Sequence, residues 1–506
     1  MSTATTLLKG SVTRVSQTFV SIAVAFFMMP FLIHKLGDHW YGIWTIIGSL
    51  AAAYHLFDMG MATAVTRYAS RYLKLEDHEQ ANQVINTALA IYLTIAGVIA
   101  LASIGISFGS RLFFDTGTDK DIIQLLVLII GFSVALEFPF NALAGVAGAR
   151  LRFHQVALAR IATTLIGAAL TFWFISQGYG VVALAIITFF TARVSNLLYY
   201  VICRRAFPQL RFNRRYLSRP MGKELFQYSA WSFAIAIAYQ LRNNVDNFVI
   251  AGFMSAAAVT PYAIGVRLVD YLAQFLSQAT NMFVPVFTGY HASGEQEEMN
   301  SKMLFVTRIN LVLAMVAGGG LAIFGQAFID RWMGADYQIA YWVMVILLVG
   351  RMIGFANHPL NSAMYAMNRH RVIAKLDMIE VACNLTLSII FVQFFGLIGV
   401  AFGTMIPLLI LRIAFLPALA CKELGIPMSR YYMSLARPIL IMLPVNAIAY
   451  YFVALTGDLT DYLSIFSFAA VVATITTVIG VKLSFTTNEK ELLRTLIPHG
   501  RLKALL

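Results

Sequence analysis

The chain has 506 residues, of which 59% are hydrophobic and only 12% are charged, and its mean hydropathy is +0.74. Soluble domains carry roughly 25% charged residues, so this composition excludes an ordinary soluble protein and indicates a polytopic membrane protein. The net charge of +13 does not indicate nucleic-acid binding, because the basic residues cluster at alternate ends of successive apolar runs. Cys203, Cys383 and Cys421 are far apart and predict neither a metal site nor a disulfide framework.

Apolar runs of membrane-spanning length follow one another along the chain. We expect about fourteen transmembrane helices, because about 20 apolar residues are needed to cross about 30 Å of hydrocarbon. The polar start, residues 1–10, leads directly into the first run, so no cleaved signal peptide is expected. The runs are 11–33, 41–66, 84–113, 121–148, 157–177, 180–202, 224–253, 257–288, 304–328, 337–367, 373–395, 398–420, 434–456 and 461–484.

The distribution of Lys and Arg among the loops predicts the orientation of the chain. One set of alternate loops holds most of them, including Arg67, Arg71 and the seven basic residues of segment 203–223. The opposite loops carry little beyond Lys35, Arg111, Lys120 and Arg331. Because loops rich in basic residues stay in the cytoplasm, both termini are expected to be cytoplasmic.

The sequence also repeats itself at about 219 residues, which is the sign of a duplicated transporter lobe. Pro139-Phe140-Asn141 recurs as Pro359-Leu360-Asn361, and the segment 180–193 recurs as 399–412. An even number of spans separates the copies, so both should have the same orientation. The expected organisation is an N-terminal lobe 1–202, a basic cytoplasmic linker 203–223, a C-terminal lobe 224–420, helices 13 and 14 in 421–484 and a cytoplasmic amphipathic tail 485–506.

Residues 30–71 carry a specific combination of short motifs. They contain Leu36-Gly37, Tyr41-Gly42-Ile43-Trp44, Phe57-Asp58-Met59-Gly60 and Arg67-Tyr68. This combination resembles the opening signature of bacterial Wzx-type polysaccharide flippases, in the superfamily of multidrug, oligosaccharidyl-lipid and polysaccharide exporters. The resemblance implies an all-α, MATE-like bundle of two pseudo-symmetric six-helix lobes around a central cavity, with two extra helices.

The same resemblance implies a function. The chain would move an undecaprenyl-pyrophosphate-linked oligosaccharide, an O-antigen or exopolysaccharide repeat unit, from the cytoplasmic to the outer leaflet of the bacterial inner membrane. Its implied partners are this substrate, membrane lipids and the polysaccharide polymerase machinery. Two alternatives stay open, a multidrug or cation antiporter of the same superfamily and a lipid II flippase. The short loops disfavour a membrane glycosyltransferase, so no enzymatic activity is expected.

Two arginines inside spans are the first candidate site residues, because an ionisable group in hydrocarbon costs several kcal/mol unless it faces protein or water. Helices 7 and 8 should form a hairpin near 254–259 that places Arg242 and Arg267 level, each about 18 Å from the turn. Asp246 lies one turn from Arg242, and Asp270 lies three residues from Arg267. Each arginine either pairs within its own helix or faces a wet cavity and binds the pyrophosphate through its planar fork.

The other candidates divide into cations and carboxylates. Arg193 and Arg412 occupy equivalent positions and serve either packing or a symmetric cationic lining, while Arg351 lies near the midplane. Arg14, near the cytoplasmic entrance, either meets the lipid pyrophosphate or only sets the topology.

Glu137 beside Pro139 and Asp58 inside the second run are candidate proton or sodium sites, with a salt bridge to an arginine as the alternative. No GxxxxGK[ST] loop occurs, so ATP is not expected to supply energy. We therefore expect coupling to a proton or sodium gradient through Glu137, Asp58, Asp246 or Asp270, without a cofactor or a bound metal.

Overall fold

The computed structural model describes residues 3–113, 119–150, 152–280, 283–455, 459, 461–487 and 489–491. These residues are almost entirely helical, and no strand occurs among them. The helices are α1 (Thr3–Tyr54), α2 (Met61–Lys74), α3 (His78–Phe113), α4 (Asp119–Ala149), α5 (Phe153–Ser176), α6 (Val181–Ala206), α7 (Arg219–Phe253), α8 (Ala256–Thr280), α9 (Phe283–Ala292), α10 (Gln296–Trp332), α11 (Gln338–Ala356), α12 (His358–Ala366), α13 (His370–Ile410), α14 (Leu416–Leu424), α15 (Met428–Leu455) and α16 (Tyr462–Ser484).

The apolar runs of the sequence correspond to these helices. Ten stretches of the described chain are long and apolar enough to cross a membrane, and two of them, Val12–Lys74 and Arg371–Leu424, each contain two expected runs. Within these two stretches, α1 and α13 each consist of two helices joined at a glycine with positive φ, Gly37 and Gly396. The expected runs 224–253 and 257–288 fall on α7 and on α8 with the start of α9. The prediction of an all-α bundle is confirmed, and the helix count is roughly consistent with the expected fourteen spans, although α7 and α8 are not among the ten stretches.

The helices repeat with the same offset as the sequence, 219 residues between Gly180 and Gly399. Shifted by this offset, α3 (78–113) becomes 297–332, and α10 is Gln296–Trp332. Shifted in the same way, α4 (119–149) becomes 338–368, which matches α11 and α12 together, 338–366. The kink at Gly396 in α13 takes the place of the turn between α5 and α6, where Gly178 also has positive φ.

Contacts divide the chain into two compact units, Met1–Thr260 and Pro261–Leu506. Helix α7 packs against α1, α2 and α3 within the first unit. The division therefore falls inside α8, later in the chain than the expected linker 203–223. The expected lobe boundaries at 202, 224 and 420 stay predictions.

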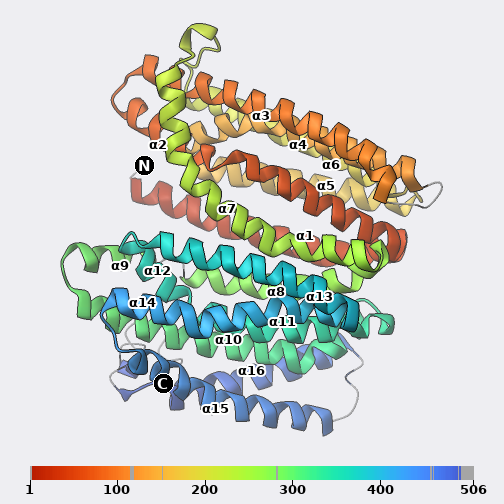
Figure 1. Ribbon diagram of the computed structural model, residues 1–506, viewed down its shortest axis with the longest axis vertical. Helices are drawn as coiled ribbons and strands as arrows, with labels where there is room; N and C mark the ends of the chain where they lie inside the picture. Colours follow the sequence, from red (N-terminus) through yellow and green to blue (C-terminus); the bar gives the residue numbers. More distant parts are fainter. Residues whose placement is uncertain are drawn as a thin grey trace. The chain divides into compact units, whose positions relative to one another are not determined.

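In the first unit, α3, α4, α5 and α6 run alongside one another, and the first helix α1 packs against α5 (Figure 1). Its apolar core includes Val84, Tyr92 and Phe138, which pack between α3 and α4. Residues of the segment after α6 are also part of a core cluster, because Phe207 and Leu210 are buried against α2, α3 and α4. This unit therefore includes the basic segment 203–223 as packed structure.

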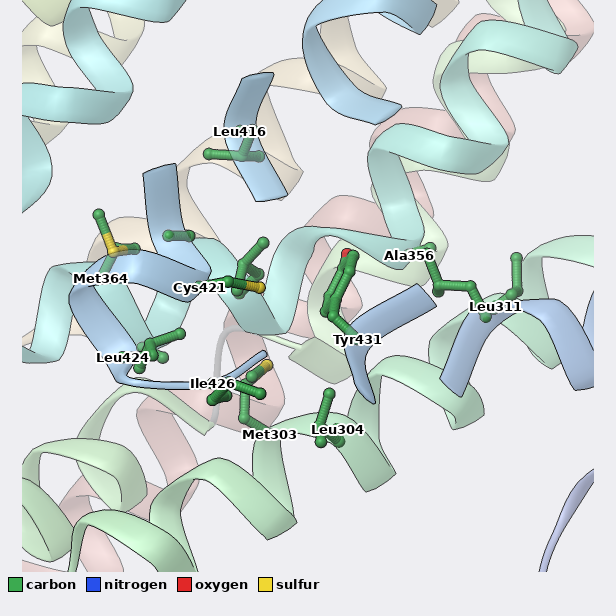
Figure 2. Packing of buried hydrophobic residues seen from close by; sticks show 14 of the residues in the cluster. Met303, Leu304, Leu311, Ala356, Met364, Leu416, Cys421, Leu424, Ile426 and Tyr431 are labelled. Carbon is green, nitrogen blue, oxygen red and sulfur yellow. The ribbon is translucent and has the colours of Figure 1, made fainter. Parts of the chain in front are cut away.

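In the second unit, α10 packs against α11, α15 and α16. A large core cluster among its described residues joins residues of α9, α10, α11, α12, α13, α14 and α15. Figure 2 shows Tyr431 of α15 among apolar side chains that include Met303, Leu304 and Cys421. Of the expected tail 485–506, Glu489 accepts two hydrogen bonds from Arg308 of α10, at 2.6 and 2.7 Å. Residues 488 and 492–506 of this tail lie outside the described residues.

The motif Tyr41-Gly42-Ile43 marks a close helix contact, and it gives the first prediction. A Cβ atom on Gly42 would lie 1.8 Å from the carbonyl oxygen of Ala256 in the first turn of α8, so nothing larger than hydrogen fits there. The hydrogen bond from Thr260 Oγ1 to the Asp38 carbonyl, 2.7 Å long, fixes the same approach. Gly42→Ala is expected to destabilise the protein by about 1–3 kcal/mol through overpacking. Thermal unfolding in detergent checks this, with Gly48→Ala, where a Cβ meets nothing within 4 Å, as the matched control.

Candidate functional site

The candidate residues that the sequence singled out are divided between the two units. Arg14, Asp58, Glu137, Arg193, Arg242 and Asp246 lie in the first unit, and Arg267, Asp270, Arg351 and Arg412 lie in the second. The structure places several of them in polar clusters inside otherwise apolar helices. The expectation that Arg242 and Arg267 lie level in the membrane involves both units and stays a prediction.

Asp58 lies where the second span is interrupted. The chain forms a 3₁₀ turn, His55–Asp58, and then passes through Met59 and Gly60 with positive φ before α2 begins. The Asp58 carboxylate accepts a 2.5 Å hydrogen bond from the Tyr92 hydroxyl of α3. It also accepts bonds from the backbone amides of Ala62 and Gly60. The carboxylate thus caps the N-terminus of α2, where backbone amides lack helical partners.

The contact between Tyr92 and Asp58 gives the second prediction. Tyr92→Phe removes one donor from a half-buried carboxylate, and a hydrogen bond to a charged group contributes about 1.5–3 kcal/mol. We therefore expect the variant to lose about 2 kcal/mol of stability, measured as thermal unfolding in detergent. In the double variant Tyr92→Phe/Asp58→Asn the amide bears no charge, so part of the loss should be recovered. A Tyr92→Phe protein as stable as the wild type would contradict the capping role.

Arg193 of α6 lies against α4. Its Nη2 donates a 2.7 Å hydrogen bond to the Ser133 carbonyl, and its guanidinium lies 5.2 Å from the ring centre of Phe189. Glu137, one turn after Ser133 on the same helix, acts on Arg193 electrostatically. The structure thus brings together two residues that the sequence treated separately, one as a cation of the cavity and one as an ion site.

The remaining candidates of the first unit lie on α7 and α1. Asp246 is buried on α7, one helical turn after the half-buried Arg242. The adjacent Asn247 donates a 2.8 Å hydrogen bond to the Ser49 hydroxyl, which ties α7 to α1. The exposed Arg14 stacks over Phe153, with its guanidinium carbon 4.2 Å from the ring centre, so this cation links α1 to α5.

In the second unit, one carboxylate lies within electrostatic range of two arginines. Asp270 of α8 is attracted electrostatically by Arg351 of α11 and by Arg267 of its own helix. The attraction by Arg351 acts between two helices and was not predicted from spacing. One carboxylate carries a single negative charge, so Asp270 alone does not neutralise the two guanidinium groups. We call these three residues the Arg267–Asp270–Arg351 cluster.

Arg412 is the centre of a second network in this unit. It lies in a π-helical turn, Leu411–Phe415, and is buried. Its Nη2 donates to Asp377 Oδ1 at 2.6 Å and to Glu380 Oε2 at 2.9 Å, both on α13. Its backbone carbonyl accepts a 2.6 Å bond from Asn357 Nδ2, and the Tyr431 hydroxyl donates to the Asn357 side chain. Such contacts are those expected if Arg412 serves helix packing, which was one of its two predicted roles.

Sequence reasoning did not find Asp377 and Glu380. A signal was present, because the two acids lie three residues apart inside the run 373–395 and so share one face of a helix. His358, at the start of α12, lies within electrostatic range of both Arg351 and Arg412 and so joins the two groups. No cluster of metal-ligating residues occurs in the described part of the chain.

The comparisons with known proteins agree on a class of transporter. The family model described as "Polysaccharide biosynthesis protein" matches residues 36–341. The uncharacterized membrane protein EpsK of Bacillus subtilis (strain 168) is 22% identical over 419 residues, which cover 80% of this chain and 81% of that protein. A putative O-antigen transporter of Shigella flexneri is 21% identical over 403 residues, covering 78% of this chain and 93% of that protein.

Solved structures share the fold. An inward-facing MATE family multidrug resistance transporter of the MOP superfamily gives a TM-score of 0.69 at 15% identity, over 82% of this chain and 98% of that chain. The lipid II flippase MurJ, in an inward closed conformation, gives 0.68 at 15% identity over 95% and 100%. These likenesses confirm the MATE-like architecture.

Proposed function

Because the chain belongs to the family of polysaccharide biosynthesis proteins, we propose that it is a flippase for an undecaprenyl-pyrophosphate-linked oligosaccharide. The cargo is an O-antigen or exopolysaccharide repeat unit, and it moves from the cytoplasmic to the outer leaflet. Movement occurs by alternating access of the two lobes, without ATP bound to this chain. The name of the Shigella flexneri relative supports this class of cargo.

The observation that carries the proposal is the Arg267–Asp270–Arg351 cluster. Two guanidinium groups, the exposed Arg267 of α8 and the half-buried Arg351 of α11, both act electrostatically on one carboxylate, so an incoming diphosphate finds cationic partners there. Guanidinium forks suit this ligand because they form paired, charge-assisted hydrogen bonds with phosphate oxygens. A headgroup with charged phosphates cannot leave water for hydrocarbon without such replacements for its hydration. Arg242, Arg193 and Arg14 are the corresponding cations of the first unit, and Arg412 holds the helices in place around the site.

The orientation belongs to the same proposal. The basic loops and both termini face the cytoplasm, and the protein lies in the inner membrane of a bacterium. The repeat unit delivered to the outer leaflet is then consumed by polysaccharide polymerase machinery. Movement is coupled to a proton or sodium gradient through carboxylates next to arginines, namely Glu137, Asp246 and Asp270. Asp58 is the weakest of the four coupling candidates, because the amides and hydroxyl around it already satisfy its charge.

A deletion strain of the native host tests the function. Lipid-linked oligosaccharide should build up in the cytoplasmic leaflet, and the wild-type gene should restore its export. Arg267→Ala and Arg242→Ala should not restore it. Arg331→Ala is the matched control, because it removes a cation that stacks on Tyr462 at the end of α10. Full activity of both site variants would refute the phosphate site, and an unchanged leaflet distribution after deletion would refute the function.

A further inference from the structure

The basic segment between α6 and α7 is held against the first unit by two buried asparagines of α3. Asn82 Nδ2 donates to the Gln209 carbonyl at 3.2 Å, and its Oδ1 accepts from the Arg211 amide at 2.7 Å. One helical turn later, Asn86 Nδ2 donates to the Arg211 carbonyl at 2.8 Å, and its Oδ1 accepts from the Asn213 amide at 3.1 Å. The two side-chain amides thus pair with the backbone as a neighbouring strand would.

This docking fixes the position of the arginines on the segment. Within the segment, Phe207 and Leu210 are buried in a core cluster. The Arg204 guanidinium donates to the Leu210 carbonyl at 2.5 Å. Because the backbone is held on both sides of Arg211, the segment presents its side chains in a defined arrangement rather than as a free tether. The entropy cost of ordering a binding site here is therefore met largely by folding.

The result is a basic pocket of about 460 Å³, which we call the linker pocket. Arg204, Arg211 and Arg215 line it, and its lining includes no acidic residue. Glu79 of α3 acts on Arg215 electrostatically from outside the lining. Three cations around one hollow attract an anion, and their forks match phosphate oxygens.

The linker pocket also has an apolar side. Tyr200 of α6 and Phe212 of the segment stack at 6.5 Å between ring centres, and both line the pocket. The Phe212 side chain is 46% exposed. Since α6 is a span that ends at Ala206, these rings lie at the level where a membrane meets water. Aromatic rings next to basic residues are typical of that interface.

A pocket of the second unit provides the contrast. It is lined by Arg369 and Lys422, but also by Glu423. Glu423 forms a 3.1 Å ion pair with Arg369, so this pocket already contains a carboxylate for one of its two cations. The linker pocket has no such carboxylate in its lining.

From these observations we propose that the linker pocket binds the phosphate headgroup of an anionic phospholipid of the surrounding membrane. The arginines hold the phosphate, and the Tyr200–Phe212 pair lies beside the start of the acyl chains. The site is separate from the transported cargo, so its failure would leave the proposed transport function untouched.

Native mass spectrometry of the delipidated full-length protein tests the site, with phosphatidylglycerol, phosphatidylcholine and inorganic phosphate as probes. Phosphatidylglycerol should bind in preference to phosphatidylcholine. Arg211→Gln/Arg215→Gln should weaken phosphatidylglycerol binding about 30-fold, which equals about 2 kcal/mol. Arg211→Lys/Arg215→Lys should keep most of it. The matched control is Arg214→Gln/Arg219→Gln, which removes the same two charges from exposed neighbours outside the pocket lining.

Three outcomes would overturn the proposal. Equal weakening by Arg214→Gln/Arg219→Gln would show diffuse surface attraction in place of a site. Equal binding of phosphatidylcholine would remove the anionic headgroup from the account. Inorganic phosphate that binds as tightly as the lipid, and is lost in the same double variant, would assign the pocket to a free anion. The melting temperature of each variant confirms that these exposed substitutions leave the fold intact.

Discussion

Arg412→Ala is expected to cost about 3–5 kcal/mol of stability, because it leaves the buried Glu380 and the half-buried Asp377 without their shared cation. Both acids contact the same guanidinium nitrogen, at 2.6 and 2.9 Å, so neither has this partner after the substitution. The effect should appear as a large drop in the thermal unfolding temperature in detergent and as a low yield of folded protein.

Two variants show whether the stability lost in Arg412→Ala comes from the broken ion network or only from the smaller side chain. Arg412→Met/Asp377→Asn/Glu380→Gln removes all three charges together and should regain most of the stability. The matched single variant is Arg193→Ala at the equivalent position of the first unit, where the hydrogen-bond partner is the Ser133 carbonyl. Its expected cost is smaller, about 1 kcal/mol. Equal losses in Arg412→Ala and Arg193→Ala would contradict the account of the network.

Arg267→Ala and Arg351→Ala are each expected to weaken binding of a pyrophosphate-linked lipid by about 30-fold, since a hydrogen bond to a charged group contributes about 1.5–3 kcal/mol. Binding is measured on the purified protein with a pyrophosphate lipid that carries an oligosaccharide. Arg267→Lys and Arg351→Lys should show intermediate affinities, because Lys keeps the charge but not the fork.

Asp270→Asn is expected to change the affinity for the diphosphate in the opposite direction, so it is a sharper control than a further loss of charge. It removes the negative charge that lies with both arginines, so a folded variant should bind the diphosphate more tightly than the wild type. Arg331→Ala should bind as the wild type does. Unchanged binding in both alanine variants, or weaker binding in a folded Asp270→Asn protein, would show that the cluster serves packing and not the cargo.

The spans and their duplication were predictable because hydropathy and repeats are local properties of the sequence. The offset between Gly180 and Gly399 predicted which helices correspond. The structural roles of the motif residues in 30–71 were not predictable, since they depend on contacts between residues that are far apart in the sequence. Gly42 is required by the carbonyl of Ala256, and Asp58 faces Tyr92, which is 34 residues away.

The polar clusters show the same limit. Spacing on one helix predicted that Asp270 could pair with Arg267, but the approach of Arg351 from α11 depends on packing between helices. Glu137 and Arg193 were each recognised as buried ionisable groups, yet their proximity follows from the contact of α4 with α6. The docking of segment 203–223 on Asn82 and Asn86 was missed because a basic stretch between spans looks like a flexible tether.

Purified protein in vesicles of defined lipid tests the central claim most directly. A fluorescent undecaprenyl-pyrophosphate oligosaccharide is placed in one leaflet, and its arrival in the other is followed with a membrane-impermeant quencher. We predict that the wild-type protein transfers it, that an imposed ion gradient accelerates the transfer, and that Arg267→Ala/Arg351→Ala abolishes it. Transfer no faster than in protein-free vesicles, together with active transport of a lipophilic cation, would contradict the account and identify a multidrug antiporter instead.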